Sequence, residues 1–174
     1  MRKPLDVRQK RVYSGKLIQL SLRRKRLPGG YVADLEVVRH PGAVLIVPLL
    51  RRDRVILIRQ YRPVIDAYIW ELPAGTLRKN ETPLRCAKRE LAEEIGCTAK
   101  AWKKIGYIYP APGYTTERIH LFTARGLTRV KSRRDQDEII TPRVFSGRTI
   151  ARLLAGGRIV DAKTICALVM SRVV

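Results

Sequence analysis

The sequence predicts a mixed α/β (α+β) protein in which an α/β/α core with a central mixed sheet follows a small N-terminal antiparallel β-subdomain. Three observations predict this fold class. The chain has 174 residues, enough for one compact core. Its first half consists of short apolar or β-branched segments separated by turn residues, and a segment near the middle carries the start, spacing and stop signals of a helix. We place the β-subdomain in residues 1–40 and the main domain in residues 41–174.

Glycine and proline separate the predicted strands. Pro28-Gly29-Gly30 is a turn, and His40-Pro41-Gly42 interrupts the chain again. Two later segments are β-branched and apolar and are joined by a charged turn at residues 51–54, so we expect them in the central sheet. The segments with strand character are residues 16–27, 31–38, 43–50, 55–61, 101–109 and 118–124.

The predicted helix lies between Thr82 and Gly96. Thr82 is a favourable N-cap, and Pro83 is favoured at the first helical position. Gly96 ends the helix, because glycine readily takes the left-handed conformation of a helix C-terminus. Four apolar side chains recur at helical spacing and predict a buried face: Leu84, Ala87, Leu91 and Ile95. We expect closing helices over residues 149–154 and 162–173.

The formal net charge of +21 is the most unusual bulk property of the chain. Such an excess suggests a nucleic-acid partner. The basic residues are nevertheless dispersed in short groups, at residues 23–26, 51–54, 103–104 and 133–134. A groove that follows a phosphate backbone needs cations clustered on one face. A nucleic-acid partner therefore stays open as an alternative that we do not favour.

No feature of the sequence predicts a membrane or secretory location. The apolar runs, such as residues 43–50, are too short to span a bilayer. The basic N-terminus is not followed by the apolar core and cleavage site of a signal peptide. Cys86, Cys97 and Cys166 are odd in number and widely spaced, and they form no metal-binding motif. We expect a reduced, cytoplasmic protein that does not bind a membrane.

The acidic residues are more informative, because nine of the 15 fall between residues 71 and 138. On the predicted helix, Glu90 and Glu94 share a face and Glu93 lies beside them. We expect this face to lie opposite the apolar one. Mg²⁺ prefers carboxylate oxygens and is commonly shared with substrate phosphates, so a pair of such ions would clamp a diphosphate and activate a water. The alternative is a solvated acidic face paired with Lys88 and Arg89.

One segment carries, at fixed spacings, Gly75, Glu81, Arg89, Glu90, Leu91, Glu93, Glu94 and Gly96. This pattern resembles the signature of the Nudix hydrolase superfamily. Only its last position is atypical, because Cys97 stands where an aliphatic residue is usual, and cysteine packs as a small apolar side chain. The resemblance implies a Nudix-like α/β/α sandwich in which the signature forms a loop, a helix and a second loop.

The resemblance also implies roles for these positions. The implied ligands of a Mg²⁺ (or Mn²⁺) ion are the Ala74 carbonyl, Glu90, Glu94 and Glu93, the last of which also counts as catalytic. Arg89 would hold the glutamates in place by charge pairing, and Glu81 would lie near the metal or the substrate. Gly75 and Gly96 would be structural.

Two further segments resemble the ADP-ribose pyrophosphatase branch of the superfamily. In the first, Arg62 would contact the diphosphate, since a guanidinium binds phosphate oxygens in a bidentate manner. In the second, Pro112 lies close to where that branch carries a marker proline. Gly113 would bring backbone close to the ligand, and Glu117 would contact the terminal ribose. Ala111 replaces the serine common there, which removes one hydrogen bond to the substrate.

The same resemblance implies a general base outside the signature, on a loop before a late strand. Residues 134–140 match this description. Glu138 is the expected base because it directly precedes the apolar pair Ile139-Ile140, and Asp135 and Asp137 are the alternatives.

The implied activity is Mg²⁺-dependent hydrolysis of the diphosphate bond of ADP-ribose, or of a similar nucleoside-diphosphate sugar, to AMP and a sugar phosphate. GDP-mannose and NADH are alternative substrates. An RNA-binding or RNA-processing protein is the alternative from another functional class. Relatives in this branch are homodimers with intertwined N-terminal sheets, so a homodimer is the implied assembly. Adenine recognition by stacking is not supported, because the N-terminal region offers only Tyr13 and Tyr31 as aromatic residues.

Overall fold

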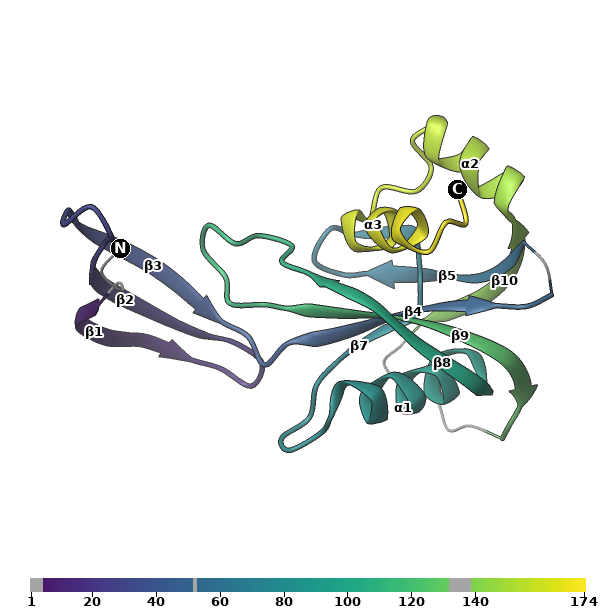
Figure 1. The fold of residues 1–174 in the computed structure, drawn as a ribbon, viewed down its shortest axis with the longest axis horizontal. Coiled ribbons are helices and arrows are strands. Elements are labelled where there is room, and N and C mark those ends of the chain that lie inside the picture. Colours follow the sequence, from purple (N-terminus) through teal and green to yellow (C-terminus); the bar gives the residue numbers. More distant parts are fainter. Residues whose placement is uncertain (1–4, 52, 132–138) are drawn as a thin grey trace. The chain divides into compact units, whose positions relative to one another are not determined.

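The computed structural model describes residues 5–51, 53–131 and 139–174. The chain divides into two units (Figure 1). The N-terminal unit comprises residues up to 42 together with residues 109–118, and the central-sheet unit comprises residues 43–108 and 119–174. The elements are, in order, β1 Leu5–Ser14, β2 Gln19–Arg26, β3 Val32–Arg39, β4 Ala43–Leu49, β5 Arg54–Arg62, β6 Ala67–Glu71, β7 Ala74–Thr76, α1 Pro83–Ile95, β8 Cys97–Ile108, β9 Ile119–Arg129, β10 Ile140–Ser146, α2 Gly147–Ala155 and α3 Ala162–Met170.

The N-terminal unit is built on a small antiparallel sheet with the strand order β1-β2-β3. The turn between β2 and β3 closes where Gly30, at φ +87°, donates to the Leu27 carbonyl at 2.9 Å. The segment 109–118 joins this unit through β3. The Val38 amide donates to the Tyr114 carbonyl at 2.8 Å, and the Thr116 amide donates to the Val38 carbonyl at 2.9 Å. This sheet confirms the predicted N-terminal antiparallel structure.

The central-sheet unit contains a seven-stranded sheet in which the order β10-β5-β4-β9-β8 forms the main path. Strand β6 pairs with β5, and β7 pairs with β4. The β4 and β9 strands are parallel, whereas β5, β7 and β8 pair antiparallel with their neighbours, so the sheet is mixed as predicted. Strand β4 is buried along its whole length, which explains its continuous apolar sequence.

Helices cover both faces of this sheet (Figure 1). On one face, α1 packs against alternate side chains of β4, including Val44 and Ile46. On the other face, Leu45 and Val47 pack with Ile150 of α2 and with residues of α3. The two hydrophobic clusters confirm the predicted α/β/α sandwich. Within the described ranges, no helix combines the length and apolar character needed to cross a membrane.

Helix α1 begins and ends as predicted. The Thr82 hydroxyl caps it by accepting from the Arg85 amide at 3.4 Å, and Gly96 closes it in the left-handed conformation at φ +64°. The buried face differs from the prediction in one position. Leu84 is 39% exposed, and Cys86 is fully buried on that face instead.

The acidic face of α1 does not lie opposite the apolar one, as we expected, but beside it. Glu90 is 7% exposed and Glu94 is 1% exposed, and Leu91 between them is fully buried. Consecutive helical residues are only about 100° apart, so Glu90 and Leu91 turn toward the same side of the protein. These glutamates are therefore internal groups and not a solvated face, contrary to the alternative reading of the sequence.

Candidate active site

The backbone of β7 passes directly against the glutamates of α1. Pairing with β4 fixes this strand, with Ala74 opposite Leu45. The Ala74 amide donates to the Glu94 carboxylate at 3.0 Å. At Gly75, a Cβ atom would lie 1.9 Å from Oε1 of Glu90, so no other residue fits without displacing that carboxylate. Four residues that the sequence assigned to one site are thus brought together: Ala74, Gly75, Glu90 and Glu94.

Arg89 lies at the centre of the surrounding carboxylates. Its Nε and Nη2 atoms donate to the two oxygens of Glu81, each at 2.9 Å. Its Nη1 donates to Glu90 at 2.5 Å and to Glu93 at 2.8 Å. The hydrogen bonds from Arg89 hold the pKa of Glu81 down at about 2, and the same glutamate raises the pKa of Arg89. Arg89 thus pairs with Glu81, Glu90 and Glu93, and its structural role and the role of Glu81 stay predictions.

The described residues of the site include more carboxylates than guanidiniums. Four carboxylates, Glu81, Glu90, Glu93 and Glu94, face two guanidiniums, because Arg78 also approaches Glu93 at 3.6 Å. Buried carboxylates are stabilised by cations or by hydrogen-bond donors, and a divalent cation is one partner that can serve several of them at once.

The donor set fits a hard divalent cation in its chemistry. Carboxylate and carbonyl oxygens are what Mg²⁺ and Mn²⁺ bind, and Gly75 leaves room for Glu90 beside the backbone. The carboxylates do not converge on one point, however. In the part of the chain that the structure describes, no three His, Cys, Asp or Glu side chains are grouped to hold a metal ion. Glu90 and Glu93 point instead at Arg89.

Cys86 is a neighbour of this site that the sequence pattern did not indicate. Its sulfur lies 3.2 Å from Nη2 of Arg89 and 3.5 Å from the Thr76 carbonyl. Burial raises the pKa of the Cys86 thiol to about 12. The side chain therefore stays protonated and acts as a small internal group.

A second charged cluster surrounds Glu71, a carboxylate that is 0% exposed at the end of β6. Arg62 donates to its two oxygens through Nε and Nη2, each at 2.6 Å. The Lys163 ammonium donates to the same carboxylate at 2.5 Å and to Asp161 at 2.7 Å. Burial pushes the pKa of Glu71 upward, but Arg62 and Lys163 outweigh it and leave the pKa below its ordinary value. Arg62, expected to contact the diphosphate, is thus held by an internal ion pair.

The other expected substrate residues belong to the N-terminal unit. Within the 109–118 segment, the Tyr114 and Thr115 amides donate to the Ala111 carbonyl at 3.3 and 3.1 Å, so the chain turns tightly around Pro112 and Gly113. The Glu117 carboxylate lies 3.7 Å from Nδ1 of His40. The roles of Pro112, Gly113 and Glu117 in binding stay predictions. The expected base Glu138, with Asp135 and Asp137, lies outside the described residues.

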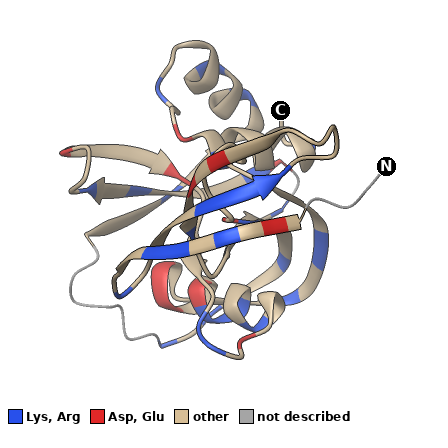
Figure 2. Ribbon diagram, turned by 90° about the vertical axis from the view of Figure 1, so that its left-hand side faces the viewer, with Lys and Arg blue, Asp and Glu red and all other residues tan. Residues whose placement is uncertain are grey.

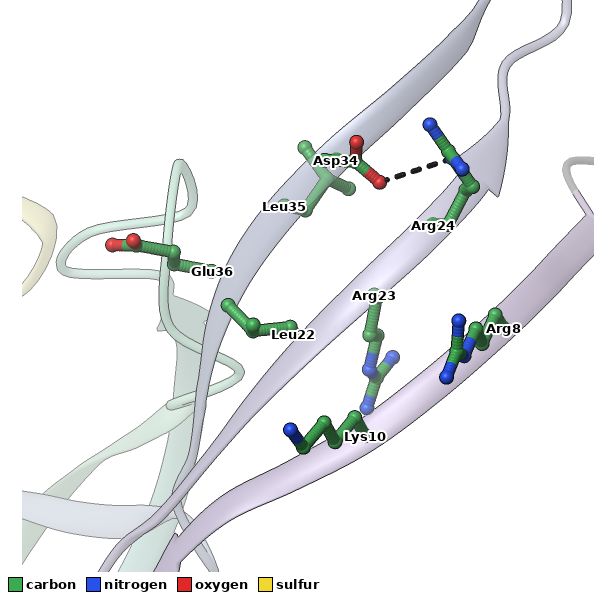
Figure 3. A pocket seen from close by; sticks show the side chains of 8 residues that line it. All are labelled: Arg8, Lys10, Leu22, Arg23, Arg24, Asp34, Leu35 and Glu36. Atoms are coloured by element: carbon green, nitrogen blue, oxygen red, sulfur yellow. Dashed lines mark ion pairs between the residues drawn. The ribbon is translucent and has the colours of Figure 1, made fainter.

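A cavity of about 540 Å³ lies against the N-terminal sheet (Figure 3). An ion pair between Arg24 and Asp34, at 3.3 Å, spans part of it. Charged side chains and two leucines line it: Arg8, Lys10, Leu22, Arg23, Arg24, Asp34, Leu35 and Glu36. No aromatic side chain is among these described lining residues.

The fold and the signature helix define a diphosphate hydrolase of the Nudix type, and comparison with known proteins supports this class. The sequence matches the NUDIX domain over residues 39–168. The chain therefore belongs to the NUDIX family. Family membership and the names of relatives confirm the expected class, a hydrolase that acts on diphosphate bonds. Hydrolases of this family generally use divalent metal ions.

Individual relatives and a solved structure agree with this placement. The chain is 35% identical to an ADP-ribose pyrophosphatase of Bacillus subtilis over 164 residues, which cover 93% of this chain and 89% of the relative. It is 31% identical to a methanol dehydrogenase activator of Bacillus methanolicus over 163 residues, covering 92% and 88% of the two chains. A crystal structure of an ADP compounds hydrolase superposes with a TM-score of 0.86 at 24% identity, covering 99% of this chain and 94% of that one. This last similarity confirms the fold.

Proposed function

We propose that this chain hydrolyses the diphosphate bond of ADP-ribose and releases AMP and ribose 5-phosphate. The observation that carries the proposal is the placement of Glu90 and Glu94 of α1 against the Ala74–Gly75 backbone, where Glu94 is almost fully buried. The similarity to an ADP-ribose pyrophosphatase along most of both chains supports ADP-ribose over other nucleoside-diphosphate sugars.

The residues of α1 and β7 would hold the ion. Glu90, Glu94, Glu93 and the Ala74 carbonyl would bind Mg²⁺, with Mn²⁺ as a substitute, and the bound ion would neutralise phosphate charge and acidify a water. Arg89 would hold Glu90 and Glu93 in position through the hydrogen bonds described above. Gly75 and Gly96 shape the backbone on either side of the glutamates.

The remaining residues would bind the substrate and move the proton. Arg62 would bind a diphosphate oxygen, and Glu81, Pro112, Gly113 and Glu117 would form the rest of the substrate site. Glu138 would accept a proton from the attacking water. The water oxygen then bonds to one phosphorus, and the bond from that phosphorus to the bridging oxygen breaks. The bridging oxygen leaves on the other phosphate, so AMP and ribose 5-phosphate account for all atoms of ADP-ribose and water.

Substitution of the two principal glutamates tests the proposal. We expect Glu90→Gln and Glu94→Gln each to lower kcat with ADP-ribose and Mg²⁺ by about 100-fold or more, since a lost metal ligand removes several kcal/mol of transition-state stabilisation. Asp53→Asn, an exposed acid in the β4–β5 turn, is the matched control and should retain full activity. Near-normal turnover in both glutamine variants would overturn the assignment.

A substrate panel defines the specificity. Values of kcat/KM for ADP-ribose, GDP-mannose and NADH rank the alternatives directly, and ADP-ribose should give the highest value. A clear preference for GDP-mannose or NADH would leave the site assignment unchanged and would show that the proposed substrate is wrong.

RNA is the second candidate ligand, because the charge is so high. Lys and Arg occupy strands and helices throughout the described chain, and β2 carries four of them in a row (Figure 2). An RNA function requires affinity that falls steeply with salt and persists in Glu94→Gln. RNA affinity that is weak at physiological salt in both wild type and Glu94→Gln would leave hydrolysis as the function.

We also propose that the protein is cytoplasmic and forms a homodimer. The boundary between the two subdomains of each chain would lie near residue 40. The strand-rich N-terminal unit supports this assembly. Light scattering after size-exclusion chromatography, on the full chain and on a chain without residues 1–40, measures how much residues 1–40 contribute to dimer formation.

A further inference from the structure

Glu71 is a buried carboxylate that receives two cations from distant parts of the chain. Arg62 ends β5, whereas Lys163 lies in the first turn of α3, 92 positions after Glu71. Arg62 binds both oxygens at 2.6 Å, and Lys163 binds one of them at 2.5 Å. A fully buried carboxylate keeps its charge only when its oxygens are paired in this way.

The N-terminus of α3 is itself anchored at the same place. Asp161 caps the helix by accepting from the Thr164 amide at 3.0 Å and accepts from Lys163 at 2.7 Å. The buried Thr164 hydroxyl accepts from the Leu72 amide at 2.9 Å. Helix α3 therefore holds both the side chain of Glu71 and the backbone of the next residue, which leads into Ala74.

This arrangement fixes the orientation of the Arg62 guanidinium. Glu71 engages the edge formed by Nε and Nη2, which leaves Nη1 at the other end of the planar group. Among the described residues, no side chain accepts from Nη1. Lys163 supplies the second positive charge, so that Glu71 and Asp161 do not have to share Arg62.

We propose that Lys163 is a positioning residue that acts through Glu71 to hold Arg62 in the orientation in which Nη1 binds a substrate phosphate oxygen. The inference rests on the proposed function, in which Arg62 contacts the diphosphate. Without Lys163, two carboxylates compete for one guanidinium, and Arg62 turns toward them.

A double-mutant cycle tests this role. We expect Lys163→Met to raise KM for ADP-ribose about tenfold with a small change in kcat, because a charge-assisted hydrogen bond to the ground-state phosphate is misaligned. Arg62→Lys should raise KM by at least as much, and adding Lys163→Met to it should change KM no further. Lys163→Arg should restore most of the lost affinity. Lys103→Met, an exposed lysine on β8, is the matched control, and thermal melting of each variant verifies the fold.

The outcomes separate this inference from the proposed function. If Arg62→Lys raises KM and Lys163→Met does not, or if the two effects multiply, the positioning role is wrong. If Arg62→Lys leaves KM unchanged, the proposed diphosphate contact itself fails.

A readout without activity completes the test. The Nε–H resonance of Arg62, assigned by its loss in Arg62→Lys, should exchange slowly with solvent in the wild type and rapidly in Lys163→Met. Unchanged exchange in Lys163→Met would overturn the inference even if the enzyme proved inactive on ADP-ribose.

Discussion

Two charged clusters in the central-sheet unit, one around Arg89 and one around Glu71, differ in the cations and carboxylates that the described residues contribute. Arg89 donates to Glu81, Glu90 and Glu93, and Glu94 lies beside them on the same helix. Around Glu71 the count is even, since two cations meet two carboxylates. Both clusters contain a nearly or fully buried glutamate, so burial alone does not distinguish them.

The described residues of the two clusters differ in how many carboxylates share each cation. In the Glu71 cluster, each buried charge has its counter-charge within the chain, and such a network stabilises one arrangement of side chains. In the Arg89 cluster, the described residues comprise four carboxylates and two guanidiniums. The proposed function places a cation from solution at these carboxylates.

Removing Arg89 is the largest predicted perturbation of stability. Arg89→Met leaves three carboxylates without the guanidinium that they share, and breaking a buried ion pair in this way costs about 3–5 kcal/mol. Urea denaturation in EDTA measures the free energy of unfolding. Added Mg²⁺ should recover part of the loss, because the ion supplies positive charge at the same carboxylates.

The corresponding change at the balanced cluster should cost less. Arg62→Met leaves Glu71 with Lys163 as a partner, so we expect a loss of about 1–3 kcal/mol that Mg²⁺ does not recover. Equal losses in Arg62→Met and Arg89→Met, or equal recovery with Mg²⁺, would contradict the difference between the clusters.

Displacing Glu90 without changing its charge should reduce activity almost as strongly as Glu90→Gln does. Gly75→Ala places a methyl group within 2 Å of Oε1 of Glu90 and pushes the carboxylate from its place beside β7, so kcat/KM should fall about 100-fold. Gly29→Ala is the matched control, since a Cβ atom there meets nothing within 4 Å. Full activity in Gly75→Ala would show that the position of Glu90 does not matter.

Acid should weaken the Arg89 cluster through Glu81. Arg89 lowers the pKa of this carboxyl from 4.5 to about 2, so its contribution is fully present above about pH 4.5 and is lost as the pH falls toward 2. We expect wild type to exceed Glu81→Gln in free energy of unfolding by something on the order of 2 kcal/mol at pH 6 in EDTA. This difference in free energy of unfolding should become smaller between pH 4 and pH 3. A difference that does not depend on pH would show that Glu81 stabilises the fold through packing and not through its charge.

Saturating metal has the smallest predicted effect. At ten times its Kd, Mg²⁺ should stabilise the folded protein by about 1.4 kcal/mol and raise Tm by about 3–6 °C. Calorimetry should show this rise for wild type and Lys163→Met and its absence for Glu94→Gln. A rise in all three would place the ion elsewhere.

The sequence predicted the parts of the fold that depend on local patterns. Helix α1 was found from Thr82 and Gly96, because caps are encoded by single residues next to the helix. Strand β1 was missed, since its charged and exposed sequence lacks an apolar alternation. Strands β6 and β7 were missed because they are short and form only through pairing with β5 and β4.

The residues of the site likewise divide into those that local sequence patterns predicted and those that they did not. The signature spacing predicted Glu90, Glu94 and Arg89 as site residues, because residues four apart lie on one face of a helix. Lys163 gave no signal, since its contact with Glu71 bridges 92 positions and depends on how α3 packs on the sheet. The burial of Glu90 and Glu94 was also beyond the pattern, because the rotation of α1 against the sheet is set by Cys86, Ala87 and Leu91.

Manganese binding followed by electron paramagnetic resonance tests the central claim most directly. Titration of Mn²⁺ into wild type, Lys163→Met and Glu94→Gln measures how much ion each protein removes from solution. Wild type and Lys163→Met should bind the ion alike, and Glu94→Gln should lose most of that affinity. Equal binding by Glu94→Gln and wild type, or no binding by any of the three, would contradict the assignment of the cation to the Arg89 cluster.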